Sequence, residues 1–257
     1  MDYFEKKVDL LNVTVSATRE DLGKRAALDV SAKIKEIIEQ NGSVRIIFAS
    51  AASQLEFLNH LKTDPDIDWS KVTAFQQDEW AGVPVDDPRS FSRFMREHLF
   101  NSVKPGNVFY LDGSADPDFE CERYGALLMQ EPIDIIILGI GENGHIAFIE
   151  PHEADFSDAR MMKKITLDDV CRQQQFHDFG FASIEDVPEY GLTITIPLIM
   201  KAAHIFVVVP GQRKALAVKH TLEWEVSERC PATILRTASN ATLYLDKDSA
   251  ALAESLN

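Results

Sequence analysis

The sequence is poor in cysteine and has no long uninterrupted apolar run. Its three cysteines, Cys121, Cys171 and Cys230, are odd in number, widely spaced and outside any CxxC pair, which argues against disulfides and a structural zinc site and favours a reducing cytoplasm. No apolar stretch is long enough to cross a membrane, and the chain has no basic-then-apolar leader. The seven histidines are scattered without HExxH spacing. We therefore predict a cytoplasmic protein that has no membrane partner, metal ion or cofactor.

Positive charge is also scarce. The 257 residues include 26 Lys and Arg against 41 Asp and Glu, a formal net charge of -15. Nucleic acid demands a basic surface, so no nucleic-acid partner is expected, and an anionic substrate would need a local positive site. The hydrophobic content of 45% is enough for a sizeable core. Because there is no internal repeat or composition break, residues 1–257 are predicted to form one domain.

The most informative stretch runs from residue 133 to residue 151. It begins with an apolar, β-branched run at 133–138 that is typical of a strand buried on both faces of a parallel sheet. A glycine-rich turn follows, and the turn leads to His145 and Glu150. Open α/β sheets bind their ligands where strands end in such turns. This layout predicts an active site.

The same turn contains a misleading pattern. Gly139, Gly141 and Gly144 match GxGxxG, the fingerprint of dinucleotide-binding sites. That fingerprint requires a helix directly after the glycines and an acidic residue about 20 positions later. Here Pro151 follows within a few residues, and residues 151–158 are typical of a loop. The pattern does not support a nicotinamide cofactor.

Segments with strand and helix patterns alternate along most of the chain, which predicts a mainly parallel sheet with helices on both faces. Residues 1–19 carry little pattern. Strands are expected at 44–48, 72–75, 108–111, 133–138, 192–196, 204–209 and 242–245, and helices at 21–40, 54–62, 90–100, 118–130, 168–176, 197–203 and 212–222.

Polar groups follow four of these strands. They are the serines at 50–53, the adjacent acids Asp78 and Glu79, the turn at 141–150, and Lys214 at the start of a helix. Each has an ordinary structural explanation as a helix cap, a solvated loop or a solvated lysine. If the strands are parallel, however, all four groups meet in one crevice. The four groups include two acids and a histidine, and the sequence has no GxSxG nucleophile motif. This combination favours proton transfer beside a carbonyl over covalent catalysis.

Three blocks of sequence resemble the signature motifs of the glucosamine-6-phosphate deaminase/isomerase family. They are FQQDEWAG at 75–82, LGIGENGHIAFIEP at 138–151 and VPGQRKALAVK at 209–219. The second block is the most specific, and the resemblance extends over residues 45–246. It implies an α/β fold of the sugar-phosphate isomerase type, a three-layer Rossmann-like sandwich with a mainly parallel central sheet, related to 6-phosphogluconolactonase.

The resemblance also implies roles for individual residues. Asp78 would move a proton between C2 and C1 of the open-chain sugar. His145 would open the sugar ring, and Glu150 would orient and charge that histidine. Glu79 and Asn143 are counted with these catalytic residues. The resemblance assigns the sugar phosphate to Ser50, Ala51, Ser53, Arg172 and Lys214, and the substrate loop to Gly141 and Gly144.

The chain departs from the family pattern around these residues. Asn143 stands where many members have Asp, and Ala51 and Ala52 replace the glycines that are usual in the phosphate loop. The family's phosphate-binding Arg aligns with Gln175. Arg172 lies three residues earlier, and because residues i and i+3 share a helix face, it is the expected substitute. One further departure is Ile149, where Asn is common.

The leading hypothesis is therefore an enzyme that converts glucosamine 6-phosphate, or a close epimer, to fructose 6-phosphate and ammonia. One alternative is a 6-phosphogluconolactonase-like hydrolase, which Asn143 favours but the paired acids do not. Another is a non-catalytic sugar-phosphate-sensing module, which has no need of Asp78, His145 and Glu150. The expected partner is a small sugar phosphate, and family members commonly form homo-oligomers.

Overall fold

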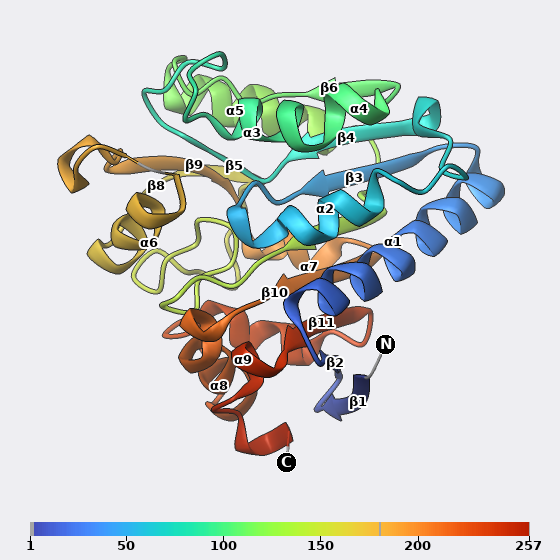
Figure 1. Ribbon diagram of the computed structural model, residues 1–257. Helices are drawn as coiled ribbons and strands as arrows, with labels where there is room; N and C mark the ends of the chain where they lie inside the picture. The colour runs from blue at the N-terminus through green and yellow to red at the C-terminus, as the bar shows by residue number, and fades with distance from the viewer. Residues whose placement is uncertain (1–2, 180, 257) are drawn as a thin grey trace.

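The computed structural model describes residues 3–179 and 181–256 (Figure 1). Its centre is an eight-stranded sheet in the order β1-β2-β11-β10-β7-β3-β4-β6. The β1–β2 pair is antiparallel and the other neighbouring pairs are parallel. The strands are β1 (Tyr3–Val8), β2 (Leu11–Ser16), β3 (Val44–Phe48), β4 (Val72–Gln76), β6 (Asn107–Phe109), β7 (Ile135–Leu138), β10 (His204–Val209) and β11 (Ala241–Asp246).

Helices cover both faces of this sheet, as the sequence predicts (Figure 1). They are α1 (Arg19–Asn41), α2 (Leu55–Leu61), α3 (Phe91–Met95), α4 (Asn101–Val103), α5 (Pro117–Leu128), α6 (Asp169–Phe179), α7 (Ile196–Lys201), α8 (Ala215–Glu223) and α9 (Lys247–Ala250). A π-helical turn at Arg96–Phe100 joins α3 to α4. None of the helices described is both long and apolar enough to cross a bilayer.

The alternation of side chains along each strand produces the two cores. In β3 every residue is buried. Ile46 and Phe48 pack into the cluster that includes α1 and α2, whereas Ile47 packs into the cluster that includes α5, α7 and α8. A strand that is buried on both faces needs apolar residues throughout, which is why the central strands were easy to predict. The three-layer α/β sandwich is confirmed.

The first two strands were missed. Leu11, Val13 and Val15 of β2 alternate with less apolar residues and are buried against the sheet, so a period-two signal was present. The strand β1 gives no such signal because its residues are largely exposed. The hairpin between the two strands places Asp9 in the left-handed region, with a φ of 52°.

A second, smaller sheet was also not predicted. It is antiparallel, with the order β5-β9-β8, formed by β5 (Asp78–Trp80), β9 (Tyr190–Ile194) and β8 (Met162–Thr166). The strand expected near 192–196 therefore exists but lies outside the main sheet, on the left in Figure 1. Asp78 opens β5, directly after β4, and pairs with Thr193.

The chain order creates a switch point in the main sheet. From β3 the chain continues to β4 and β6 on one side, and from β7 it continues to β10 and β11 on the other. Connections that leave neighbouring strands in opposite directions open a crevice at the carboxyl ends of those strands. The segments that follow β3 and β7 therefore lie where a ligand is expected.

Candidate active site

A cavity lies at the carboxyl ends of β3, β4, β7 and β10. All four strand-end segments predicted from the sequence contribute to its lining, which includes Ser50, Ala51, Ser53, Asp78, Gly141, His145 and Lys214. The residue types are those of a small-molecule site with several converging polar groups.

Several buried polar atoms in this lining have no hydrogen-bonding partner in the described part of the chain. They are Ser50 Oγ, Gln77 Oε1, Asp78 Oδ1, His145 Nδ1 and Gln175 Oε1. A buried polar atom without a partner costs about 1–3 kcal/mol, and such atoms are rare in native proteins. Five of them around one cavity indicate a ligand that is itself rich in polar groups.

The segment after β3 forms a tight turn. Ala51 is extended and precedes the single 3₁₀ turn Ala52–Gln54, which leads into α2. The side chain of Gln54 donates from Nε2 to Ser53 Oγ and to the carbonyl oxygen of Val208 in β10, each at 3.1 Å. This contact holds the turn against the end of the neighbouring strand. It leaves Ser50 Oγ at the cavity wall.

The carboxyl group of Asp78 lies at the cavity and is only 3% exposed. Burial, and then the neighbouring charge of Glu79, raises its pKa well above the usual value of 3.8. A carboxylate that is costly to keep ionised is a stronger base than one in water. Asp78 therefore has the properties of a general base.

Glu79 points away from the cavity, since successive residues of a strand face opposite sides. Its carboxylate accepts hydrogen bonds from the backbone N–H groups of Trp80, Phe91 and Ser92 and from the Ser92 hydroxyl, at 2.9–3.0 Å. Three of these four donors belong to the first turn of α3. Glu79 anchors α3 beneath the site and does not line the cavity, and its expected catalytic role stays a prediction.

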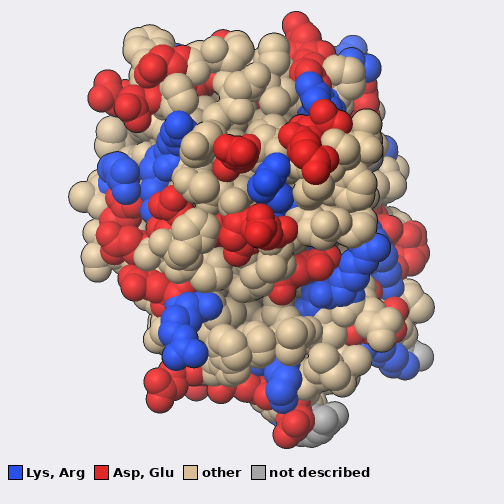
Figure 2. Space-filling view, turned by 90° about the vertical axis from the view of Figure 1, so that its left-hand side faces the viewer, with Lys and Arg blue, Asp and Glu red and all other residues tan. Residues whose placement is uncertain are grey.

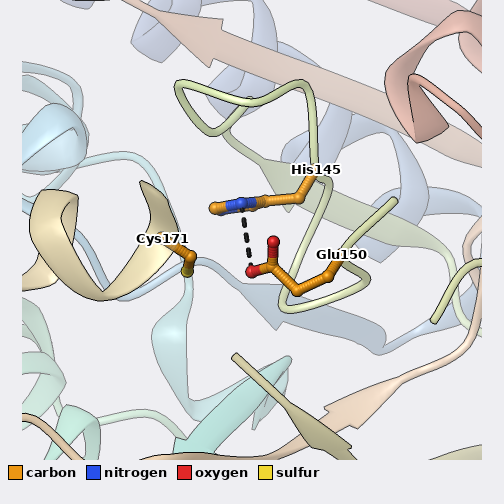
Figure 3. Close-up of side chains that lie close together, drawn as sticks. All are labelled: His145, Glu150 and Cys171. Atoms are coloured by element: carbon orange, nitrogen blue, oxygen red, sulfur yellow. Dashed lines mark ion pairs between the residues drawn. The ribbon is translucent and has the colours of Figure 1, made fainter. Parts of the chain in front are cut away.

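His145 and Glu150 form a buried pair. Nδ1 of the histidine lies 3.4 Å from Oε1 of Glu150, and the two side chains are 7% and 0% exposed (Figure 3). Burial opposes ionisation of Glu150, but the charge and hydrogen bonding of His145, with hydrogen bonds from Cys171 and Asn143, outweigh it and lower the pKa. The pair thus favours an ionised carboxylate behind the imidazole.

Two glycines of the loop occupy positions that a side chain would disturb. A Cβ atom on Gly141 would collide with the His145 ring, so this glycine makes room for the histidine. Gly144 has a φ of 86°, which side chains rarely adopt, and a Cβ atom there would meet Cys230 Sγ. Gly141 is therefore required for the packing of the histidine, and Gly144 for the turn.

Asn143 bridges two carboxylates. Its Nδ2 atom donates to Glu150 Oε2 at 2.5 Å and to Asp168 Oδ2 at 2.8 Å, and its Oδ1 atom accepts from the His145 N–H at 3.1 Å. Sequence reasoning missed Asp168. The other oxygen of Asp168 accepts the backbone N–H of Cys171 at 2.7 Å at the start of α6, so an Asp just before a predicted helix was the available signal.

Lys214 is the cation of the cavity. Gly211, with a φ of 91°, turns the chain after β10, and its N–H donates to both oxygens of Asp246. The turn Gln212–Lys214 then places the lysine at the wall, 8% exposed. Burial lowers its pKa. An anionic ligand would compensate for this burial.

Arg172 does not reach the cavity, contrary to expectation. Its Nη2 atom donates to the carbonyl oxygens of Ile184 and Val187, both at 3.0 Å. Gln174 and Gln175 of the same helix line the cavity instead. Residues three apart differ by about 60° around a helix, and here that rotation directs Arg172 to the neighbouring segment. The positive charge expected from Arg172 is therefore absent from the residues that line the cavity.

The surface around the site has no strong bias of charge. Figure 2 shows the side of the molecule on which α6 and the small sheet lie in Figure 1, where acidic and basic side chains are interspersed. Such a surface does not resemble the continuous basic footprint of a nucleic-acid site. The positive charge that an anionic ligand needs is therefore local, as at Lys214.

These features define a sugar-phosphate isomerase-type site on a Rossmann-like sheet, and the chain belongs to the glucosamine-6-phosphate isomerase/6-phosphogluconolactonase family. The sequence model of that family matches residues 17–244. A glucosamine-6-phosphate deaminase of Bacillus cereus (strain B4264) is 34% identical over 243 residues, which are 94% of this chain and 89% of that protein.

Solved structures agree with this assignment. The structure described as a monomeric glucosamine-6-phosphate deaminase superposes with a TM-score of 0.86 at 32% identity, over 93% of this chain and 99% of that one. The 6-phosphogluconolactonase of Trypanosoma brucei superposes with a TM-score of 0.78 at 21% identity, over 99% of this chain and 100% of that one. The second likeness establishes the shared fold.

Proposed function

We propose that this enzyme converts glucosamine 6-phosphate, or a close epimer, to fructose 6-phosphate and ammonia. The observation that carries the proposal is the set of five buried polar atoms without a hydrogen bond in one cavity, two of which belong to Asp78 and His145. A phosphorylated amino sugar offers hydroxyl, amino and phosphate groups to such a set. The 34% identity to a glucosamine-6-phosphate deaminase across most of the chain supports the same substrate class.

The first step is opening of the sugar ring. The imidazole of His145 lies at the cavity wall, and the carboxylate of Glu150 lies behind it, 3.4 Å from Nδ1. His145 can give a proton to the ring oxygen and take up the proton that the hydroxyl at C1 loses. The product is an open-chain amino aldose.

The second step is proton transfer along the sugar chain. Asp78 takes the proton from C2 and returns a proton to C1, while O1 gains a proton and the amino nitrogen loses one, which leaves a C2 imine. Water adds to the imine, and ammonia leaves, so that the sum is amino sugar phosphate plus water giving ketose phosphate plus ammonia. The raised pKa of Asp78, caused by burial and by Glu79, suits a carboxyl group that must both accept and give this proton.

The phosphate group would bind at Lys214 and the Ser50–Ala51–Ser53 turn. A second cavity adjoins the first and shares Ser53 and Lys214 with it. Arg213 lines this second cavity and is solvent-exposed. We infer that Arg213 supplies the second positive charge that Gln175 does not.

Two alternatives are separated from this proposal by one set of assays. A lactonase would hydrolyse 6-phosphogluconolactone rapidly and release no ammonia from amino sugars. A sensing module would bind sugar phosphates without turnover. The deaminase proposal requires ammonia and ketose in equal amounts, and it requires that Asp78→Asn and His145→Gln variants, verified as folded, lose that activity.

Two broader expectations stay predictions. A homo-oligomer is expected because family members commonly form one, although the 32%-identical relative is described as monomeric. A cytoplasmic location is expected from the cysteine pattern and suits an enzyme of sugar-phosphate metabolism.

A further inference from the structure

We propose that His145 Nδ1, Glu150 Oε1 and Cys171 Sγ form a binding site for a thiophilic divalent cation such as Zn²⁺, and that the bound ion arrests catalysis. Cys171 is a buried residue in the first turn of α6. Its thiol has no part in the reaction proposed above. Figure 3 shows the three side chains directed toward one another from the glycine-rich loop and α6. The inhibitory consequence rests on the proposed function, whereas the binding site does not.

The geometry suits a small tetrahedral ion. One ligand atom from each of the three residues lies within 4.8 Å of the others, and the Nδ1–Oε1 separation is 3.4 Å. In a tetrahedral zinc site with Zn–N and Zn–O distances near 2.0–2.2 Å, neighbouring ligand atoms are about 3.3–3.5 Å apart. The histidine and glutamate are therefore already spaced as two ligands of one ion, and the thiol lies within 4.8 Å of both.

Two of the three ligand atoms face each other without a hydrogen bond of good geometry. His145 Nδ1 and Glu150 Oε1 are both buried and form an ion pair at 3.4 Å, and neither meets the geometry of a hydrogen bond within the described ranges. An ion between them would use lone pairs that this long contact satisfies poorly. This observation separates the cluster from a chance grouping of polar residues.

The ligand types determine which ion would bind. A thiolate together with an imidazole and a carboxylate favours zinc and other borderline or soft cations over Mg²⁺ and Ca²⁺, which prefer oxygen ligands. Binding would replace the proton of the Cys171 thiol, which leaves to solvent. The thiolate and the Glu150 carboxylate then balance the two charges of the ion.

Neighbouring side chains hold the ligands in place. Asn143 donates to Glu150 Oε2 and so leaves Oε1 directed toward the cluster. The Gln175 side chain lies against Cys171 Sγ, with a Nε2–Sγ distance of 4.0 Å. Outer contacts of this kind raise the affinity of metal sites. His145 also lines the cavity, so that water or a sugar hydroxyl could complete the fourth position.

The ion would compete with the reaction for the same atoms. With Nδ1 and Oε1 bound to a cation, the imidazole would be held by the ion, and His145 could not transfer a proton to the ring oxygen. The sequence analysis predicts no metal ion, and the proposed site departs from that prediction. Its three ligands come from positions 145, 150 and 171, a spacing that matches no metal motif.

The test is metal binding to the full-length protein. Zn²⁺ affinity is measured by competition with a chromophoric chelator, and Co²⁺ is used as a spectroscopic probe of thiolate ligation. We expect one Zn²⁺ per chain and a thiolate-to-cobalt charge-transfer band. Cys171→Ser should weaken Zn²⁺ binding at least tenfold and abolish the band, with Cys171→Ala as a second variant if the first does not fold.

Cys121→Ser is the matched control because Cys121 is a partly buried thiol on α5, outside the cluster. It should bind both metals as wild type does. Unchanged Zn²⁺ affinity in both folded Cys171 variants, or a cobalt spectrum without thiolate absorption in wild type, would overturn the proposal.

Inhibition is then tested as the ratio of ammonia release with and without Zn²⁺ within each variant. The ratio should fall in wild type and Cys121→Ser and stay near one in Cys171→Ser at the same metal concentration. If wild type proves inactive on amino sugar phosphates, the binding experiment still decides whether the site exists, so the two proposals fail separately.

Discussion

The Nδ2 atom of Asn143 lies 2.5 Å from Oε2 of Glu150, and the same nitrogen donates to Asp168. The amide thus separates two carboxylates at the back of the site. An Asp at position 143, as in the common family pattern, would bring three carboxyl groups together without a donor between them. Asn143 and Asp168 therefore complement each other: position 168 supplies a carboxylate, and position 143 supplies the hydrogen-bond donor that lies between it and Glu150.

This relationship predicts that Asn143→Asp is destabilising at neutral pH. The variant loses two hydrogen bonds in a buried setting and gains like-charge repulsion, so we expect the free energy of unfolding to fall by about 1–3 kcal/mol. Denaturant unfolding measures it. The double variant Asn143→Asp with Asp168→Asn restores one donor and should recover much of the loss. A single variant as stable as wild type would contradict this account of the pair.

Glu79 should matter for stability more than for catalysis. Glu79→Gln replaces one acceptor oxygen by an NH₂ group that faces backbone donors, and we expect a loss of about 1–3 kcal/mol in unfolding free energy. The kcat of the folded variant should stay within a few-fold of wild type, because Glu79 does not line the cavity. Steady-state kinetics beside thermal unfolding separates the two effects, and a hundredfold loss of kcat at unchanged stability would argue against the anchoring role.

Lys214 and Arg172 should respond differently to loss of charge. Lys214→Gln removes the cation at the cavity wall, and we expect KM for the sugar phosphate to rise at least tenfold, equivalent to about 1.4 kcal/mol.

Arg172→Gln is the comparison. It should leave KM within twofold and lower stability, because the guanidinium holds two carbonyl oxygens outside the site. Kinetics over a range of substrate concentrations gives both values. An increase in KM for Arg172→Gln as large as that for Lys214→Gln would return Arg172 to the phosphate site.

Asp78→Asn should lower activity and raise stability. Loss of a general base costs about 10²–10⁴ in rate. Burial and Glu79 raise the folded-state pKa well above the usual 3.8, so over the interval between these values the folded protein binds a proton that the unfolded chain lacks. Wild-type stability therefore falls as pH rises through this interval.

The variant cannot ionise at position 78, so this part of the pH dependence should disappear. It should be more stable than wild type at pH 8, and the difference should shrink toward pH 4. The unfolding free energies of both proteins, measured at several pH values, test whether the variant is the more stable one. A variant less stable than wild type at pH 8 would show that the Asp78 carboxylate is stabilised in the fold.

Residue patterns were sufficient where burial alone decides the structure. The strand at Val44–Phe48 is apolar except for Arg45 because helices cover both faces, and its parallel neighbours give similar signals. The strands Asp78–Trp80 and Met162–Thr166 are short and acquire their partners only through antiparallel pairing with Tyr190–Ile194. No local pattern specifies that pairing.

The candidate site shows the same division between features that residue patterns predict and features that tertiary contacts decide. Strand ends identified the segments that meet at the cavity, but side-chain direction decided the role of each residue. Asp78 and Glu79 are neighbours with opposite directions, and Arg172 turns away where Gln175 turns in. Asp168 joins the site only through Asn143, 25 residues earlier in the chain. These relationships depend on tertiary contacts that the sequence pattern does not contain.

The most direct test of the central claim is simultaneous measurement of ammonia and fructose 6-phosphate from glucosamine 6-phosphate, with wild type and Asp78→Asn side by side. The account predicts equal amounts of the two products from wild type and a loss of both by at least a hundredfold in the folded variant. Ketose without ammonia, or equal turnover by wild type and Asp78→Asn, would contradict it.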